Sequence, residues 1–297
     1  MSRLEEALKR ADPESGAPSA QGTEGTLDAY VVEQPAARPE DSPVNEPQGP
    51  ADEPVRDIAG PGGGPFHVLT SPDVASKVVV GSEIPPLSVE QYRRLAAYLH
   101  HAQADRGLKV VMVASALPGE GKTLTASNLA LTLSESYQRR VLLVDADLRR
   151  PSIHQVFSLP NMSGLTDGLR AVEPRKLTVV EVSPQLSVLP AGRPDPDPMS
   201  VLTSERMQQV LDEARDRFDW VIVDTPPVGL LPDAHLLAAM VDGTLLVVRA
   251  GATPARAVTQ ATHVIGRERL LGVVLNRVDE ASLSHGGYYY SYYERNR

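Results

Sequence analysis

The sequence contains no cysteine among its 297 residues. This absence excludes disulfides, thiolate metal sites and cysteine nucleophiles, although it does not identify a cellular compartment. No apolar run reaches the ~18 residues that a membrane-spanning helix needs, and the N-terminus lacks the apolar core of a signal peptide. Together these absences predict a soluble, cytoplasmic protein, in the compartment where ATP is available.

The sequence also lacks a basic surplus. Its net charge is -9. Residues 1–65 carry most of it, because they hold 13 acidic and five basic side chains, a net charge of -8. The other 25 acidic and 24 basic side chains give a net charge of only -1. Since no excess of positive charge is available to neutralise a phosphate backbone, we do not expect nucleic acid as a partner.

Residues 1–65 divide into a short amphipathic helix and a linker. Apolar side chains recur at helical spacing at Leu4, Ala7, Leu8 and Ala11. This stripe predicts a helix that is too short to be stable alone in water, so it either forms on docking to a partner or frays. From residue 12 to residue 65 the chain has ten prolines, many acidic residues and few large apolar ones, which predicts a disordered linker.

The chain is organised around residues 110–128, VVMVASALPGEGKTLTASN. The apolar run Val110–Val113 predicts a strand of a parallel sheet, followed by a glycine-containing loop and a helix. In a phosphate loop, backbone N–H groups converge on an anion, Lys122 reaches the β- and γ-phosphates, and the Thr123 hydroxyl ligates Mg²⁺. Ala116 replaces the first glycine of the usual pattern. We therefore predict a nucleotide site made of Pro118, Gly119, Glu120, Gly121, Lys122, Thr123 and Leu124.

Two further apolar runs lead into carboxylates. The run Val141–Val144 predicts a buried strand that is followed by Asp145 and Asp147. The run Trp220–Val223 predicts another buried strand, which ends in Asp224. Because ligands bind at the carboxyl ends of parallel strands, these side chains suit Mg²⁺ coordination and proton acceptance beside the phosphate loop. The last of them is expected to hold the Mg²⁺ shell through water.

Helices and strands alternate along the rest of the chain. We expect helices at residues 89–104, 205–217 and 254–266, and strands at residues 186–189, 244–248 and 271–275. Ser88 and Gln91 form a capping-box signature at the start of the first of these helices. Residues 161–198 are rich in turn signals. This alternation predicts an α/β fold with a doubly wound, mostly parallel sheet, in a domain that spans residues 66–283.

Residues 284–297 are rich in tyrosine, with five of the nine tyrosines of the chain. These five are Tyr288, Tyr289, Tyr290, Tyr292 and Tyr293. The cluster follows a Gly-Gly pair and shows no alternation of polar and apolar residues, so it does not suit an edge strand. We predict a flexible tail that presents phenolic hydroxyls.

Three motifs, together with the tyrosine tail, closely resemble the bacterial tyrosine kinases of capsule and exopolysaccharide synthesis. The motifs are Ala116–Thr123, Leu142–Arg149 and Val221–Pro227, which match the Walker A, Walker A′ and Walker B motifs of that family. The second, an apolar run followed by Asp-x-Asp-x-Arg, is the most discriminating. The resemblance covers about residues 66–297. It implies a P-loop NTPase fold like that of partition ATPases and an ATP-dependent kinase that phosphorylates its own tail.

The resemblance also implies roles and partners. Lys122 and Thr123 would bind phosphate and Mg²⁺. Asp145 and Asp147 would supply the catalytic base and metal contacts, and their spacing leaves open which one is the base. Asp224 would hold the metal through water. The first residues resemble those of soluble members encoded apart from a membrane polysaccharide co-polymerase, which implies recruitment to the inner face of the plasma membrane and self-association before phosphorylation.

The chain departs from related patterns at two positions. Glu90 and Arg93 match the family's oligomerisation helix, but Ala96 stands where a third basic residue is usual, so ring formation is not implied. Leu117 stands where related partition ATPases carry a lysine that reaches across a dimer. A switch ATPase with dimerisation as its output and a non-catalytic ATP-binding regulator remain as alternatives. Leu117 and the tyrosine tail count against the first, and the intact motif residues count against the second.

Overall fold

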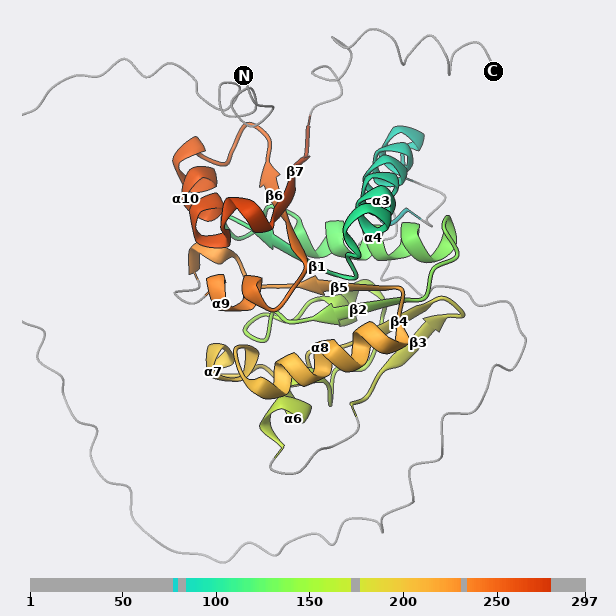
Figure 1. The fold of residues 1–297 in the computed structure, drawn as a ribbon, viewed down its shortest axis with the longest axis vertical. Helices are drawn as coiled ribbons and strands as arrows, with labels where there is room; N and C mark the ends of the chain where they lie inside the picture. The colour runs from blue at the N-terminus through green and yellow to red at the C-terminus, as the bar shows by residue number, and fades with distance from the viewer. Residues whose placement is uncertain (1–76, 80–83, 172–176, 231–233, 279–297) are drawn as a thin grey trace, which may run out of the picture. The chain divides into compact units, whose positions relative to one another are not determined.

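The computed structural model describes residues 77–79, 84–171, 177–230 and 234–278. The predicted N-terminal helix, the linker and the tyrosine tail therefore lie outside the described residues. The described strands are β1 Val110–Ser115, β2 Val141–Asp145, β3 Val180–Ser183, β4 Leu186–Leu189, β5 Trp220–Asp224, β6 Gly243–Arg249 and β7 Leu270–Asn276. They form one sheet in the order β3-β4-β2-β5-β1-β6-β7, in which only the β3–β4 pair is antiparallel (Figure 1).

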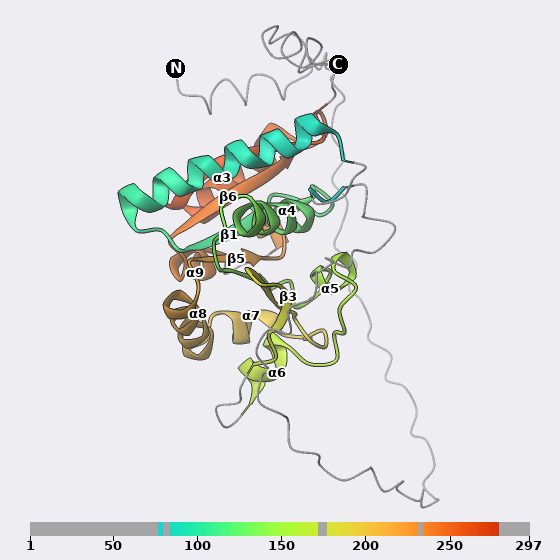
Figure 2. The ribbon, with the colours of Figure 1, turned by 90° about the vertical axis from the view of Figure 1, so that its right-hand side faces the viewer.

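Helices cover both faces of this sheet, as a doubly wound fold requires. They are α3 Pro86–Arg106, α4 Lys122–Glu135, α5 Ile153–Val156, α6 Leu165–Arg170, α7 Pro198–Leu202, α8 Glu205–Arg217, α9 Ala234–Ala239 and α10 Ala255–Ile265, with 3-10 turns η1 Val228–Leu230 and η2 Arg267–Arg269. Figure 2 shows α3 and α4 on one side of the sheet and α8 and α9 on the other. Among the described residues, no helix combines the length and the apolar character needed to cross a membrane.

The central strands are buried on both faces, which explains why they are continuous apolar runs. In β1, Val111 and Val113 join the core beneath α3 and α4, whereas Val110 and Met112 join the core beneath α8 and α10. Alternate residues of a strand point to opposite faces, so a strand between two helix layers needs apolar side chains at every position. This burial is the physical origin of the runs from which the parallel sheet was predicted, and the predicted fold class is confirmed.

The strand order brings the three predicted motifs to one edge of the sheet. Strand β5 lies between β2 and β1, although it follows both in the chain. Asp145 at the end of β2 pairs in register with Asp224 at the end of β5. On the other side of β5, Val113 of β1 also pairs with Asp224. The phosphate loop that follows β1 therefore starts beside both carboxylates.

Two local predictions need correction. Helix α3 begins at Pro86, with Pro85 as its N-cap and no side-chain capping bond, so the predicted capping box at Ser88 is wrong. Proline suits the first helical position because its φ is already helical and that position needs no N–H partner. The turn-rich interpretation of residues 161–198 is incomplete, because α6 and β3 lie within them. Both elements are too short to show a clear periodicity in sequence.

Candidate active site

The phosphate loop connects β1 to α4. Gly119 and Gly121 adopt left-handed backbone conformations with φ of 78° and 94°. Gly121 is also the N-cap residue of α4. The positive φ of Gly121 favours glycine, and a Cβ there would lie 2.1 Å from Nδ2 of Asn276, so it would also displace that side chain. Helix α4 then begins at Lys122, and its first N–H groups have no partner within the helix, which is the arrangement that binds anions.

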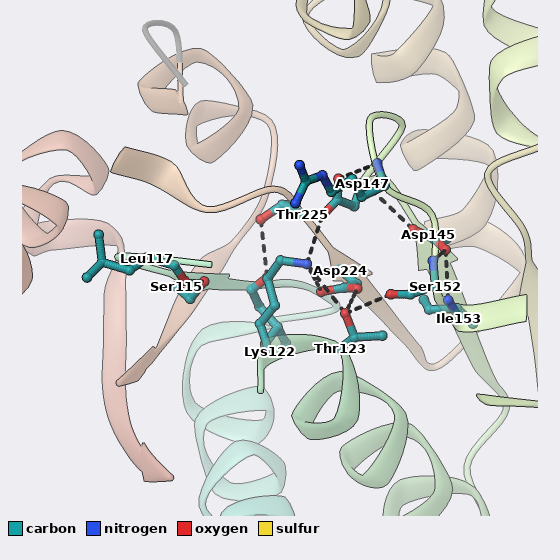
Figure 3. Close-up of polar contacts among 12 residues, drawn as sticks. Ser115, Leu117, Lys122, Thr123, Asp145, Asp147, Ser152, Ile153, Asp224 and Thr225 are labelled. Atoms are coloured by element: carbon teal, nitrogen blue, oxygen red, sulfur yellow. Dashed lines mark hydrogen bonds and ion pairs between the residues drawn. The ribbon is translucent and has the colours of Figure 1, made fainter. Parts of the chain in front are cut away.

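The Lys122 ammonium lies between carboxylates from two strand ends (Figure 3). Its Nζ is 2.9 Å from Oδ2 of Asp147 and 3.4 Å from Oδ1 of Asp224. Burial by itself would lower the pKa of Lys122, but the charges of Asp224 and Asp147 outweigh burial and raise this pKa. The side chain therefore carries a full positive charge at the loop, where an anionic ligand needs it.

Thr123 brings a hydroxyl to the same point. Its Oγ1 donates to Oδ2 of Asp224 at 2.7 Å and accepts from Oγ of Ser152 at 3.2 Å. Burial raises the pKa of Asp224, and the charge of Lys122 and the bond from Thr123 oppose that effect. The carboxylate is thus held in a fixed orientation by partners from the loop.

Asp145 is placed differently from Asp147, although only one residue separates them. Asp145 is fully buried, and its two oxygens accept from the backbone N–H groups of Asp147, Ser152 and Ile153 at 3.0–3.2 Å. Burial, followed by the charge of Asp224, raises the pKa of Asp145 to about 7. Asp145 shapes the chain that follows β2, whereas Asp147 contacts Lys122 directly.

The other predicted nucleotide-binding residues occupy three kinds of position. Pro118 and Gly119 are exposed on the loop. Leu124 is half-buried, and its side chain packs against the core beneath α4. Glu120 is buried, and its carboxylate accepts from the N–H of Leu117 at 2.8 Å. The phosphoacceptor tyrosines lie outside the described residues.

The donor set suits Mg²⁺ by its chemistry. Thr123, Asp147 and Asp224 offer hydroxyl and carboxylate oxygens, the ligands that this hard cation prefers. Within the described part of the chain, no three acidic or histidine side chains are grouped so that they could hold a metal by themselves. Mg²⁺ keeps several waters and shares its remaining ligands with substrate phosphates, so one hydroxyl and two carboxylates would be enough to hold it.

Comparison with known proteins decides the family. The family model named ParA, described as NUBPL iron-transfer P-loop NTPase, matches residues 108–279. The tyrosine-protein kinase YwqD of Bacillus subtilis is 37% identical over 215 residues, which cover 71% of this chain and 90% of YwqD. The chain belongs to the bacterial tyrosine kinase family. Its P-loop NTPase fold and its membership of a protein-tyrosine kinase family, both predicted from sequence, are confirmed.

Solved structures agree with this kinase assignment. The kinase domain of the Escherichia coli tyrosine kinase ETK is 32% identical, has a TM-score of 0.59, and matches over 64% of this chain and 77% of that domain. The chimerical protein CapA2B2 is 29% identical, has a TM-score of 0.63, and matches over 72% of this chain and 95% of the chimera. The fold of this chain therefore matches most of the length of each of these solved chains.

Leu117 of this kinase does not join the charged cluster. Its side chain is 38% exposed and lies away from Lys122, on the other side of the close-up (Figure 3). A leucine here cannot supply the positive charge that a lysine would bring to a neighbouring site. The position therefore agrees with the family assignment.

Three polar residues of the kinase contact the loop or its threonine but were not predicted. Ser152 reaches Thr123 from the start of α5. Thr253, between β6 and α10, and Asn276, at the end of β7, both bond to Glu120. No spacing in the sequence marks these residues, because each comes from a segment that only the fold brings to the loop.

Proposed function

We propose that this protein is an ATP-dependent tyrosine autokinase that phosphorylates its own C-terminal tyrosines in trans. The observation that carries the proposal is the position of the Lys122 ammonium, between Asp147 and Asp224 and beside the Thr123 hydroxyl. A chain of this family that retains these groups and carries a tyrosine tail contains both the groups that would bind ATP and the hydroxyls that would accept its phosphate. The acceptors are Tyr288, Tyr289, Tyr290, Tyr292 and Tyr293.

The residues at the loop suit phosphoryl transfer from ATP. This reaction depends on positioning and charge neutralisation more than on covalent help from the protein. Lys122 and the loop N–H groups would stabilise the γ-phosphoryl group as it leaves ADP. The Thr123 hydroxyl and the Asp224 carboxylate would hold Mg²⁺, which when bound neutralises further phosphate charge. The hydrogen bonds among Lys122, Thr123 and Asp224 would hold these side chains in position for the phosphates.

Asp147 is the better placed of the two candidate bases. A tyrosine hydroxyl has a pKa near ~10, so it is protonated at neutral pH and must lose its proton during attack. The two oxygens of Asp145 already accept three backbone N–H bonds. Asp147 accepts only one backbone N–H, from Arg150 through Oδ1, and directs Oδ2 toward Lys122, where the phosphoryl group would sit. We therefore assign the role of general base, which accepts the tyrosine proton, to Asp147. Asp145 would act indirectly, by holding the backbone that follows β2.

Phosphorylation of the tail would also change assembly. A tail bound in a neighbour's site adds a contact between subunits. Each phosphate adds about -1.5 to -2 charge at neutral pH, so a phosphorylated tail would be repelled by the acidic groups of the site. The protein would then pass from oligomer to monomer as its tail is labelled, which couples ATP use to an assembly cycle.

Mixing two variants tests transfer between molecules. One variant carries Lys122→Met and an intact tail, and the other is active but has Phe at all five tail tyrosines. We expect phosphotyrosine on the inactive protein, at a rate that rises with the concentration of the active one. Mass spectrometry of the C-terminal peptide measures it.

The matched control replaces the active partner with a protein that carries both the five Phe substitutions and Lys122→Met, and it should give no label. If the inactive protein stays unlabelled while wild type is labelled at a concentration-independent rate, the tail serves its own site. Unlabelled wild type would overturn the autokinase proposal itself.

We further propose that the first residues recruit a membrane polysaccharide co-polymerase at the inner face of the membrane, so that the kinase regulates exopolysaccharide synthesis. Support comes from the apolar stripe of Leu4 and Leu8, which suits docking to a partner. Leu4→Glu with Leu8→Glu should weaken association with that partner in a pull-down while ATP binding is unchanged. Glu5→Gln with Glu6→Gln, which leaves the stripe intact, is the control. Equal partner binding by both variants would count against this role.

A further inference from the structure

A carboxylate lies buried in the loop that should bind phosphate. Glu120 is 3% exposed, and its Oε2 accepts from the N–H of Leu117 at 2.8 Å. Its Oε1 accepts a hydrogen bond from the hydroxyl of Thr253. A negative charge within an anion site opposes the ligand by electrostatics alone. The position of Glu120 therefore calls for a role other than attraction of the nucleotide.

Thr253 ties this carboxylate to a separate part of the fold. It lies between β6 and α10, 133 residues along the chain from Glu120, and it is 5% exposed. Its Oγ1 also accepts from the N–H of Arg249 at 3.0 Å. The same hydroxyl therefore stabilises the turn after β6 and contacts the phosphate loop. The Glu120 carboxylate thus links the start of the phosphate loop, through Leu117, to the turn that follows β6, through Thr253.

A second anchor holds the same residue from its backbone. Nδ2 of Asn276, at the end of β7, donates to the carbonyl oxygen of Glu120 at 2.8 Å. Asn276 also packs against Gly121, the N-cap residue of α4. The loop is therefore anchored on the side of β1 that faces β6 and β7, away from Asp145 and Asp147.

We infer that Glu120 and Thr253 are positioning residues for the nucleotide, because their hydrogen bond holds the phosphate loop in the shape that directs its N–H groups at the phosphates. The inference rests on nucleotide binding by this loop, which the proposed function also requires. It does not depend on tyrosine phosphorylation. A preformed loop binds more tightly than one that must be ordered by its ligand, since the cost of ordering is already met in folding.

The hydroxyl of Thr253 can be tested by itself. Thr253→Val keeps the volume and removes the donor, which leaves Oε1 of Glu120 unpaired. We expect the Kd for Mg·ADP, measured by titration calorimetry, to rise at least about tenfold, since a hydrogen bond to a charged group is lost. Thr253→Ser restores the hydroxyl and should bring the Kd back to within about twofold of wild type.

Thr262→Val is the matched control. Thr262 is also 5% exposed, and its hydroxyl donates to the carbonyl of Val258, four residues earlier in α10. This substitution should leave the Kd for Mg·ADP unchanged, even if the thermal midpoint of unfolding falls. Wild-type affinity in a folded Thr253→Val protein, or an equal loss in both valine variants, would overturn the inference.

The direction of change in Glu120→Ala gives an independent test. If the carboxylate acted mainly by its charge, removing it would strengthen Mg·ADP binding. The positioning role predicts weaker binding, because both hydrogen bonds of the Glu120 carboxylate are lost, while the bond from Asn276 to the Glu120 carbonyl remains. A Kd for Mg·ADP at or below the wild-type value in Glu120→Ala would overturn the inference, and a folded Glu120→Ala decides the matter even where Thr253→Val fails to fold.

Discussion

Phosphotyrosine is expected to disappear from a Lys122→Met protein incubated alone with Mg·ATP. The ammonium is the positive charge that Asp147 and Asp224 hold at the loop, and methionine fills its volume without that charge. Charged groups that stabilise phosphoryl transfer contribute large factors, so we expect the rate to fall at least about 10³-fold. The rate of phosphotyrosine formation, measured on purified protein, checks this expectation.

The Lys122→Met protein should still fold, because the loop backbone does not need the ammonium to form. Its thermal midpoint should nevertheless fall, since removing the cation leaves buried carboxylates without their counter-charge. Lys109→Met is the matched control. Lys109 is half-buried, and its Nζ donates to the carbonyl of Arg215 at 2.7 Å, away from the loop. Retained phosphotyrosine in folded Lys122→Met, with Lys109→Met normal, would move the active site elsewhere.

Asp147→Asn is expected to cause the second large loss of phosphotransfer. The amide has nearly the same shape, but it has neither the charge that pairs with Lys122 at 2.9 Å nor the basicity to accept a proton. Loss of a positioned general base costs about 10²–10⁴-fold in rate. Stopped assays of tail phosphorylation at saturating Mg·ATP measure this loss. The thermal midpoint should fall less than in Lys122→Met, because Lys122 keeps Asp224 as a counter-charge.

Two other aspartates make the result interpretable. Asp145→Asn should lower both activity and thermal stability, because an NH₂ group would face backbone N–H donors that Asp145 now accepts. Asp219→Asn should leave activity intact, since Asp219 pairs with Arg140 at the amino end of β5. Wild-type phosphotransfer by Asp147→Asn would remove Asp147 from the chemistry and return the base to Asp145.

Local patterns in the sequence determined the elements of this protein and its family. The apolar runs predicted β1, β2 and β5, and the helix predicted at residues 205–217 matches α8. Three motifs and a tyrosine cluster sufficed to indicate the bacterial tyrosine kinases. Each of these signals lies within a few neighbouring residues, because helical and strand periodicity and motif spacing are short-range properties of a chain.

Only the tertiary structure decided which side chains meet. Lys122 contacts Asp224 across 102 residues because β5 inserts between β2 and β1, and no local period encodes that order. Asp145 and Asp147 look equivalent in sequence. In the fold, Asp145 accepts three backbone N–H bonds, whereas Asp147 contacts the Lys122 ammonium. Thr253 carries no motif at all. Its contact with the loop arises because strand pairing brings the carboxyl ends of β1 and β6 to the same edge, and pairing over such separations depends on the whole sheet.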